Sequence, residues 1–349
     1  MAATRYRRRP LLLPLTLGIA LLVLHAAVET GASASKGPST PPSAPAGIVW
    51  PAPPDPARIR FVRTLDPTTV QGAPSLMKKM WRTLVGPSEP VRMRQPYGIA
   101  VGADRKVYVA DTAGGTIHVY DLAKPGYAAL RVTATSLIGI AAAAGRLFVT
   151  DSVAGTVQAL DLRGRTIWSL GPSAGFVRPT GIVAAGDRLY VVDTVRHAVV
   201  VVSLSGAWVG TFGGPGSGPG QLNFPTNIAC GRDGRIHVTD TMNFRVQVFE
   251  PDGRFVGAFG RLGDGPGDLD KPKGVALDSD GHIYVVEGLH DVVQIFNASG
   301  RLLLVFGGSG SGDGQLWLPS GIAIANDFVF VADSANGRVQ IYEYLRTGP

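Results

Sequence analysis

The sequence is poor in the residue patterns that build many catalytic and metal sites. Its 349 residues include one cysteine, Cys230, which excludes an intramolecular disulfide and a zinc site built from thiolates. Its glycine-rich segments lack the Gly-Lys-Ser/Thr of phosphate-binding loops, and no serine is paired with a recurring histidine. The formal charge of +7 falls to +4 (29 basic and 25 acidic residues) when residues 1–34 are left out, which is mild for this size, so we do not expect a nucleic-acid partner.

What the sequence does contain is a repeat of 41 to 47 residues, present in six copies. A small residue opens each copy, and an acidic residue follows twelve or thirteen positions later. The opening residues are Gly98, Gly139, Gly181, Asn227, Gly274 and Gly321, and the acids are Asp111, Asp151, Asp193, Asp240, Glu287 and Asp333. Because one such unit cannot bury its apolar face alone, the copies are expected to stack on one another.

Each copy is predicted to form four short antiparallel strands. In the fourth copy, RIHVTD (235–240) and RVQVFE (245–250) alternate apolar and polar residues, as half-buried strands do. Asp-Gly pairs at 233–234 and 252–253 mark the tight turns beside them. Six four-stranded units arranged radially make an all-β fold, a six-bladed β-propeller.

The ends of the repeat region predict how the propeller closes. The sixth copy supplies three strands and stops at Leu345, while RFVRTL (60–65) matches the outer strand RFVGAF (254–259) of the fourth copy. The N-terminal strand is therefore predicted to complete the sixth blade, which removes an exposed sheet edge.

Two segments resemble the NHL repeat. TDTMNFRVQVF (239–249) and ADSANGRVQIY (332–342) contain an Asp, then an Asn and an Arg, then an apolar-Gln-apolar-aromatic strand. The resemblance extends over about residues 95–345 and weakens in the second and third copies, where SVAGTVQAL lacks the Arg and TVRHAVVVV lacks the Asn and Gln. It implies a six-bladed propeller similar to exported bacterial NHL-repeat proteins.

The N-terminal region predicts export. Residues 1–34 contain RYRRRP, an apolar run and then ASA, which is the layout of a cleaved signal peptide. An uncleaved membrane anchor is the alternative, because the apolar run reaches the short end of a membrane span. Both place the propeller, residues 58–345, outside the cytoplasm, in the periplasm or the extracellular space. Residues 35–57 are rich in Pro, Ser and Ala and are predicted to form an extended linker.

One inserted amphipathic helix is predicted at residues 74–86, PSLMKKMWRTLVG. One half of this helix would be apolar and the other half basic. The apolar positions are Leu76, Met77, Met80, Trp81, Leu84 and Val85. The helix could pack across one face of the propeller or offer a cationic surface to a membrane or a partner.

The repeated acids indicate architecture rather than chemistry. Asp111, Asp151, Asp193, Asp240 and Asp333 recur in register, and each is expected to accept backbone N–H groups of a nearby turn. Arg245 and Arg338 are expected to pair with such acids.

Positions where one copy departs from the others are better candidates for a site. They point to Asn227, Glu287 and His290 as a ligand-binding cluster. No metal site or cofactor is expected, because the histidines share no common position; His237, for example, aligns with Tyr284.

These observations favour an exported, monomeric propeller whose loops bind a protein, a peptide or a glycan, with the N-terminus as a membrane tether if it stays uncleaved. The alternative is a propeller enzyme, a metal-dependent lyase or lactonase with its site at the central channel, because the fold hosts both kinds of function.

Overall fold

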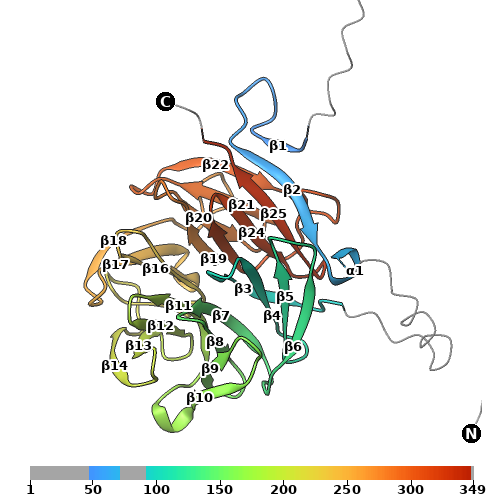
Figure 1. Cartoon of the computed structure of the whole chain (residues 1–349). Coiled ribbons are helices and arrows are strands. Elements are labelled where there is room, and N and C mark those ends of the chain that lie inside the picture. Colours follow the sequence, from blue (N-terminus) through green and yellow to red (C-terminus); the bar gives the residue numbers. More distant parts are fainter. Residues whose placement is uncertain (1–46, 71–91, 347–349) are drawn as a thin grey trace, which may run out of the picture. The chain divides into compact units, whose positions relative to one another are not determined.

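The computed structural model describes residues 47–70 and 92–346. The chain divides into two compact units, Met1–Ala46 and Gly47–Pro349, and every described residue belongs to the second. Among these residues no helix is long and apolar enough to cross a membrane. They form six antiparallel sheets set around a common centre, which confirms the predicted six-bladed β-propeller (Figure 1).

Five blades each contain four consecutive strands. Blade 1 contains β3 (Pro96–Val101), β4 (Lys106–Asp111), β5 (Thr116–Asp121) and β6 (Tyr127–Arg131). Blade 2 contains β7 (Leu137–Ala143), β8 (Arg146–Asp151), β9 (Thr156–Asp161) and β10 (Thr166–Leu170). Blade 3 contains β11 (Pro179–Ala185), β12 (Arg188–Asp193), β13 (Ala198–Ser203) and β14 (Trp208–Gly213). Blade 4 contains β15 (Ile228–Cys230), β16 (Ile236–Asp240), β17 (Arg245–Phe249) and β18 (Phe255–Phe259). Blade 5 contains β19 (Pro272–Leu277), β20 (Ile283–Glu287), β21 (Val292–Phe296) and β22 (Leu302–Gly307).

The sixth blade is closed by the N-terminal part of the propeller, as the sequence predicts. It contains β23 (Ile322–Ala325), β24 (Phe328–Asp333), β25 (Arg338–Tyr344), β2 (Ile59–Leu65) and β1 (Val49–Trp50). β2 pairs with β25 from Ile59 opposite Tyr344 to Leu65 opposite Val339, so backbone hydrogen bonds join the N-terminal and C-terminal strands of the propeller within one blade.

β1 lies within residues 35–57, the range whose composition indicates a linker. It adds a fifth strand by pairing with β2. The Trp50 ring then packs 5.8 Å from Phe306 and 5.7 Å from Tyr342, measured between centroids. The ordered blade therefore begins before residue 58, while residues 35–46 lie outside the described part of the chain.

The helix expected at residues 74–86 also lies outside the described residues. The helices that are described are short: α1 (Pro67–Val70) after the closing strand, and the 3-10 turns η1 (Pro172–Ala174) and η2 (Thr241–Asn243).

Antiparallel pairing sorts the connections onto two faces. We call one the interblade-loop face; it holds the turns from the second to the third strand of each blade and the connections from one blade to the next. We call the other the hairpin face; it holds the turns from first to second strand and from third to fourth.

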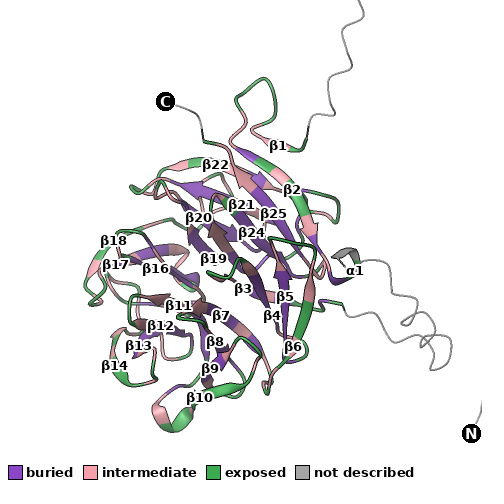
Figure 2. Cartoon of the chain, in the orientation of Figure 1, coloured by how far each residue is buried: buried purple, intermediate pink, exposed green. Residues whose placement is uncertain are grey.

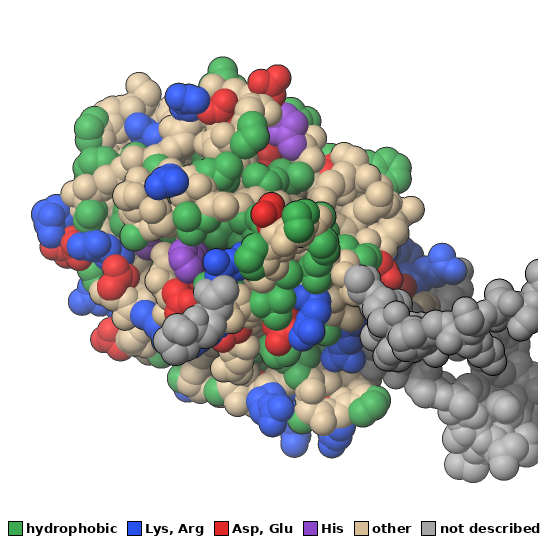
Figure 3. All heavy atoms as spheres, turned by 90° about the horizontal axis from the view of Figure 1, so that it is seen from above, with side chains coloured by type: hydrophobic (Ala, Val, Ile, Leu, Met, Phe, Trp, Pro, Cys, Tyr) green, Lys and Arg blue, Asp and Glu red, His purple; other side chains and the backbone are tan. Residues whose placement is uncertain are grey.

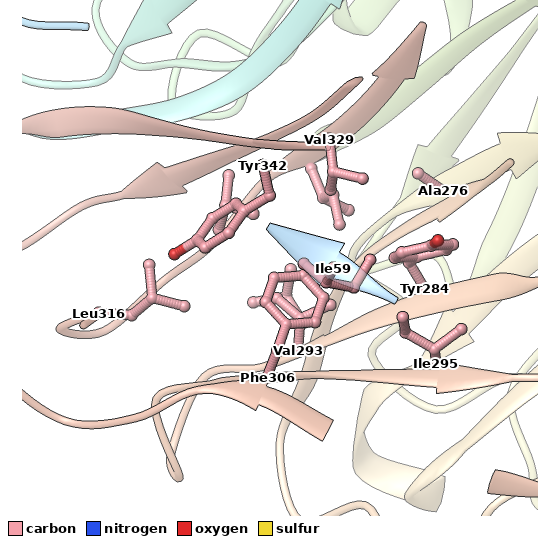
Figure 4. Close-up of a cluster of buried hydrophobic side chains, with 12 residues drawn as sticks. Ile59, Ala276, Tyr284, Val293, Ile295, Phe306, Leu316, Val329 and Tyr342 are labelled. Atoms are coloured by element: carbon pink, nitrogen blue, oxygen red, sulfur yellow. The ribbon is translucent and has the colours of Figure 1, made fainter. Parts of the chain in front are cut away.

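The core lies between the blades. The second strands are buried along nearly their whole length, whereas the outer strands β6, β10 and β14 alternate between exposed and half-buried residues (Figure 2). Six hydrophobic clusters each draw buried side chains from two neighbouring blades. In one of them, Ile59 of the closing strand lies among Tyr284, Phe306 and Tyr342 (Figure 4). Each blade therefore depends on its neighbours for its core.

Candidate functional site

The first strands of the six blades line a central channel with a cavity of about 220 Å³. Its walls are aliphatic side chains and glycines, among them Ile140, Ile182 and Ile322. Glycine is required because the first strands of adjacent blades lie so close: a Cβ on Gly321 would sit 2.0 Å from the carbonyl oxygen of Tyr97. Cys230 also lines the channel, and burial raises the pKa of its thiol, so the thiol form is favoured.

The repeated acids fasten the loop that enters each blade. Asp111 accepts the backbone N–H groups of Arg94 at 2.7 Å and Gln95 at 3.1 Å, before the first strand, and that of Ala113 at 3.1 Å in its own turn. Asp193 does the same with Val177 and Arg178 in blade 3. Each carboxylate thus ties a second strand to the connection that arrives from the previous blade.

The residues that carry the NHL resemblance extend this network in blade 4. Asp240 also accepts Nδ2 of Asn243 at 2.8 Å, Nε of Arg245 at 2.8 Å and Nε2 of Gln247 at 2.9 Å. Arg245 in turn donates to the carbonyl oxygens of Gly218 and Gln221. The Asn, the Arg and the Gln therefore hold the glycine-rich connection in place by hydrogen bonds. Blade 6 has the same three contacts around Asp333.

Glu287 occupies the same place as the repeated aspartates. It is fully buried and accepts the N–H groups of Asp270 at 3.0 Å, Lys271 at 2.7 Å and Leu289 at 3.3 Å. Burial raises the pKa of this carboxyl, and the backbone hydrogen bonds oppose that shift. Its longer side chain thus serves the same entering loop rather than the channel.

His290 and Asn227 lie in different surroundings. His290 is half-buried in the turn after β20, close enough to Glu287 to lower its pKa electrostatically. Asn227 lies in the channel wall instead, where its Oδ1 accepts the N–H of Ile228 at 2.8 Å. The structure therefore brings Glu287 and His290 together and places Asn227 apart from them, although all three belong to the interblade-loop side.

Two histidines are held by acidic residues of their own blades. His118 is held by Asp111 and Tyr127, and His282 by Asp278. Over residues 47–70 and 92–346 there is no group of three or more His, Cys, Asp or Glu side chains that could hold a metal ion. Gly171–Gly175 has the spacing Gly-x-Ser-x-Gly, but it forms the 3-10 turn η1 rather than the strand-to-helix elbow of a nucleophilic serine.

The sequence reasoning missed a set of exposed apolar residues on the interblade-loop face. They stand two positions after the repeated acid in four consecutive blades, where solvent exposure would predict polar residues. They are Val153, Val195, Met242 and Leu289, with 68%, 43%, 47% and 54% of their surface exposed. We call them the apolar turn ring. They occupy equivalent turns of one face, one in each of blades 2 to 5. The aligned repeat already indicated this ring, because the position two residues after the acid is never polar. The two remaining copies have Ala113 and Ala335 there.

Two further apolar side chains stand on this face in a rare backbone conformation. Phe224 has φ +46° and Leu318 has φ +47°, and they are 44% and 47% exposed. A left-handed conformation is costly for bulky residues and persists where neighbours enforce it. Here the neighbours are side chains of the preceding blade: His197 Nδ1 accepts the N–H of Phe224 at 3.1 Å, and Asp291 accepts that of Leu318 at 2.7 Å.

Basic side chains gather where the connections meet the channel mouth. Arg94, Arg178 and Lys271 are exposed and stand one or two residues before the innermost strands. Arg178 is near enough to Tyr97 to oppose the rise that burial causes in the pKa of that phenol. The half-buried Lys273 adds a fourth cation; burial lowers its pKa, and Lys271 lowers it further. Elsewhere charges are interspersed, as on the side seen in Figure 3.

Comparison with known families gives three partial matches. The family model described as "6-bladed beta-propeller" matches residues 225–303, and that of the NHL repeat matches residues 316–342. A third, described as "Outer membrane protein assembly factor BamB", matches residues 78–210. No curated protein matches the sequence significantly.

Many solved structures share the fold at low sequence identity. A streptogramin B lyase is 15% identical with a TM-score of 0.57, over 73% of this chain and 95% of its own. A gluconolactonase from Xanthomonas campestris is 17% identical with a TM-score of 0.59, over 86% of this chain and 99% of its own. A chain of a nidogen/laminin complex is 19% identical with a TM-score of 0.54, over 68% of this chain and 86% of its own. At these identities the likeness demonstrates the propeller fold alone.

Proposed function

We propose that this chain, an NHL-repeat six-bladed β-propeller, works outside the cytoplasm as a scaffold that binds a protein partner on its interblade-loop face. The observation that carries the proposal is the apolar turn ring, Val153, Val195, Met242 and Leu289. Exposed apolar side chains that recur on one face of a protein are a feature of interaction surfaces.

The basic residues of the channel mouth indicate the chemistry of the partner. Arg94, Arg178 and Lys271 lie on the same face as the apolar turn ring, so an apolar segment that also carries carboxylates would match both features. The strained positions of Phe224 and Leu318 support the same interpretation, because they hold large side chains outward at fixed points. The aliphatic lining of the channel supports binding more than acid–base chemistry.

The export predicted from residues 1–34 sets where this partner would be met, at the cell envelope or beyond it. The nidogen/laminin complex is an example of a related fold in a protein–protein complex, which agrees with a scaffold role.

The test compares capture of partners from an envelope extract by two double variants. Met242→Glu with Leu289→Glu places charges in the ring, and capture is expected to fall about tenfold or more, because two apolar contacts are replaced by groups that resist desolvation. The matched control, Leu162→Glu with Leu303→Glu, alters side chains that are 38% and 47% exposed away from this face, and capture is expected to persist. Equal capture by both folded variants would refute the proposed surface.

A further inference from the structure

In the second strand of every blade but one, the residue three positions before the repeated acid is aromatic and fills the space between neighbouring blades. These residues, all at most 2% exposed, are Tyr108, Phe148, Tyr190, Tyr284 and Phe330. Blade 4 has His237 instead, at the same position of β16. An imidazole is shorter than a phenol or a phenyl ring, so this substitution removes volume from the space between blades 4 and 5.

The tyrosines at this position also use their hydroxyl groups. Tyr108 donates to Asp104 at 2.7 Å, and Tyr284 donates to Asp278 at 3.2 Å. In blade 4 the residue equivalent to Asp104 is Asp233, and its side chain is 55% exposed. Arg235 approaches it only to 3.7 Å. The carboxylate that a phenol would have met is thus left at the edge of the vacated space.

A cleft of about 890 Å³ opens at this place on the hairpin face. It is bordered by the first hairpins of blades 4 and 5 and by the outer strand β18. His237 borders it while being 95% buried (5% exposed), and its Nδ1 is buried without a hydrogen-bond partner among the described residues. A buried unpaired polar atom costs about 1–3 kcal/mol, so its retention calls for an explanation.

The walls of the cleft present both hydrogen-bond donors and acceptors. Asp233 and Asp280 can accept, and Arg235 can donate. The His282 ring is fixed from behind, because its Nδ1 meets the fully buried Asp278 at 2.8 Å, which leaves Nε2 as the nitrogen available to a ligand. Apolar side chains such as Phe259 and Leu277 complete the lining.

A cleft between neighbouring blades also occurs elsewhere on the propeller. Blades 6 and 1 also enclose a cleft, of about 550 Å³, next to Phe330. Its lining is mainly aliphatic and aromatic, including Val62, Leu122 and Ile341. Both clefts are lined by two arginines, but only the cleft beside His237 also has carboxylates and imidazoles in its lining.

We propose that this cleft is a binding site for a neutral saccharide, whose hydroxyl groups occupy the place of the missing tyrosine. A hydroxyl can donate to Asp233 and accept from Arg235 or an imidazole at once, which suits a wall of mixed donors and acceptors. The cleft lies within the range of about 300–1,000 Å³ typical of small-ligand sites. It is on the face opposite the partner surface, so this site is independent of the proposed scaffold function.

The test gives blade 4 the aromatic residue that the other blades have at the position of His237. His237→Tyr supplies the phenol that three other blades carry, so the variant is expected to fold and to occupy the place assigned to the sugar hydroxyl. Binding of a panel of neutral sugars (glucose, galactose, mannose, N-acetylglucosamine and their disaccharides) is measured on the purified full chain by titration calorimetry and ligand-observed NMR. At least one sugar should bind the unaltered chain, and His237→Tyr should weaken it about tenfold or more.

A second variant keeps the test decisive if His237→Tyr misfolds. Asp233→Asn removes a cleft carboxylate and should weaken the same sugar, while Asp252→Asn, which alters a hairpin of the same blade outside the cleft, should not. Absence of binding to every sugar of the panel, or equal binding by the unaltered chain and the folded cleft variants, would overturn the proposal. Binding of N-acetyltyrosinamide without any sugar would likewise overturn it and indicate a phenolic side chain as ligand.

Discussion

Asp240 shows how one carboxylate can organise a blade. It is fully buried and accepts the N–H of Asn223 before the first strand, together with the side chains of Asn243, Arg245 and Gln247. The Arg245 side chain is only 17% exposed. Among the described residues, Asp240 is the carboxylate that pairs with its guanidinium, and this ion pair would be lost if Asp240 were removed.

We therefore expect Asp240→Ala to lower the free energy of unfolding by about 3 kcal/mol, because it leaves a partly buried cation and several polar groups without their acceptor. Urea denaturation followed by circular dichroism measures the change. Asp252→Ala is the control: this carboxylate caps only Arg254 N–H in an exposed hairpin, so a loss of about 0.5 kcal/mol or less is expected. Comparable losses for both variants would show that the network contributes little.

The same residues mark what the sequence could and could not predict at this scale. The repetition of Asp240 and the motif around Arg245 predicted a structural network, since an equivalent residue in every blade serves the fold. Glu287 stood out as a longer side chain, yet the sequence alone does not show that its carboxylate is buried against the entering loop. The exposure of Met242 and Leu289 was hidden for the same reason, because an apolar residue in a turn is buried in one fold and exposed in another.

At the scale of elements, the closing strand β2 was predictable and β1 was not. β2 repeats the alternation of an outer strand, and its apolar positions fit the register with β25. Val49 and Trp50 lie between proline-rich stretches, so their composition indicates a linker. Tertiary packing overrides that indication, because Trp50 meets the rings of Phe306 and Tyr342.

Removing the closing strand should therefore have a different effect from removing what precedes it. A truncation of residues 1–65 exposes the edge of β25 along the whole β2 pairing, and such an edge is a template for aggregation. We expect this variant to form large species in size-exclusion chromatography. A truncation of residues 1–46 retains β1 and β2 and should elute as a compact species. A soluble, compact 1–65 truncation with an unchanged melting temperature would contradict the closure by β2.

At the scale of the whole molecule, the propeller is a ring of shared cores. Every hydrophobic cluster is divided between two neighbouring blades, and the closing strand makes the last of these connections. A ring of this kind holds its loops at fixed relative positions, so the partner proposed for the interblade-loop face would meet a preorganised surface and little ordering cost would be added on binding. The two faces carry different surfaces: apolar and basic on one side, and a polar cleft on the other.

The shared cores also predict that the ring unfolds as one cooperative unit. Phe306 is 1% exposed, and its ring lies 4.9 Å from that of Tyr342, so Phe306→Ala should lower stability by about 3–5 kcal/mol through the cavity it leaves. If blades cannot keep their cores alone, this loss will reach blades 2 and 3, which Phe306 does not touch. Hydrogen–deuterium exchange with mass spectrometry measures this directly: amides of β8 and β12 should exchange faster by a factor similar to those of β21 and β25. Val256→Ala, on the outer strand β18 and 38% exposed, is the control and should change none of them. Faster exchange confined to blades 5 and 6 would mean that the blades open separately, and the scaffold would then be a chain of independent units rather than a rigid ring.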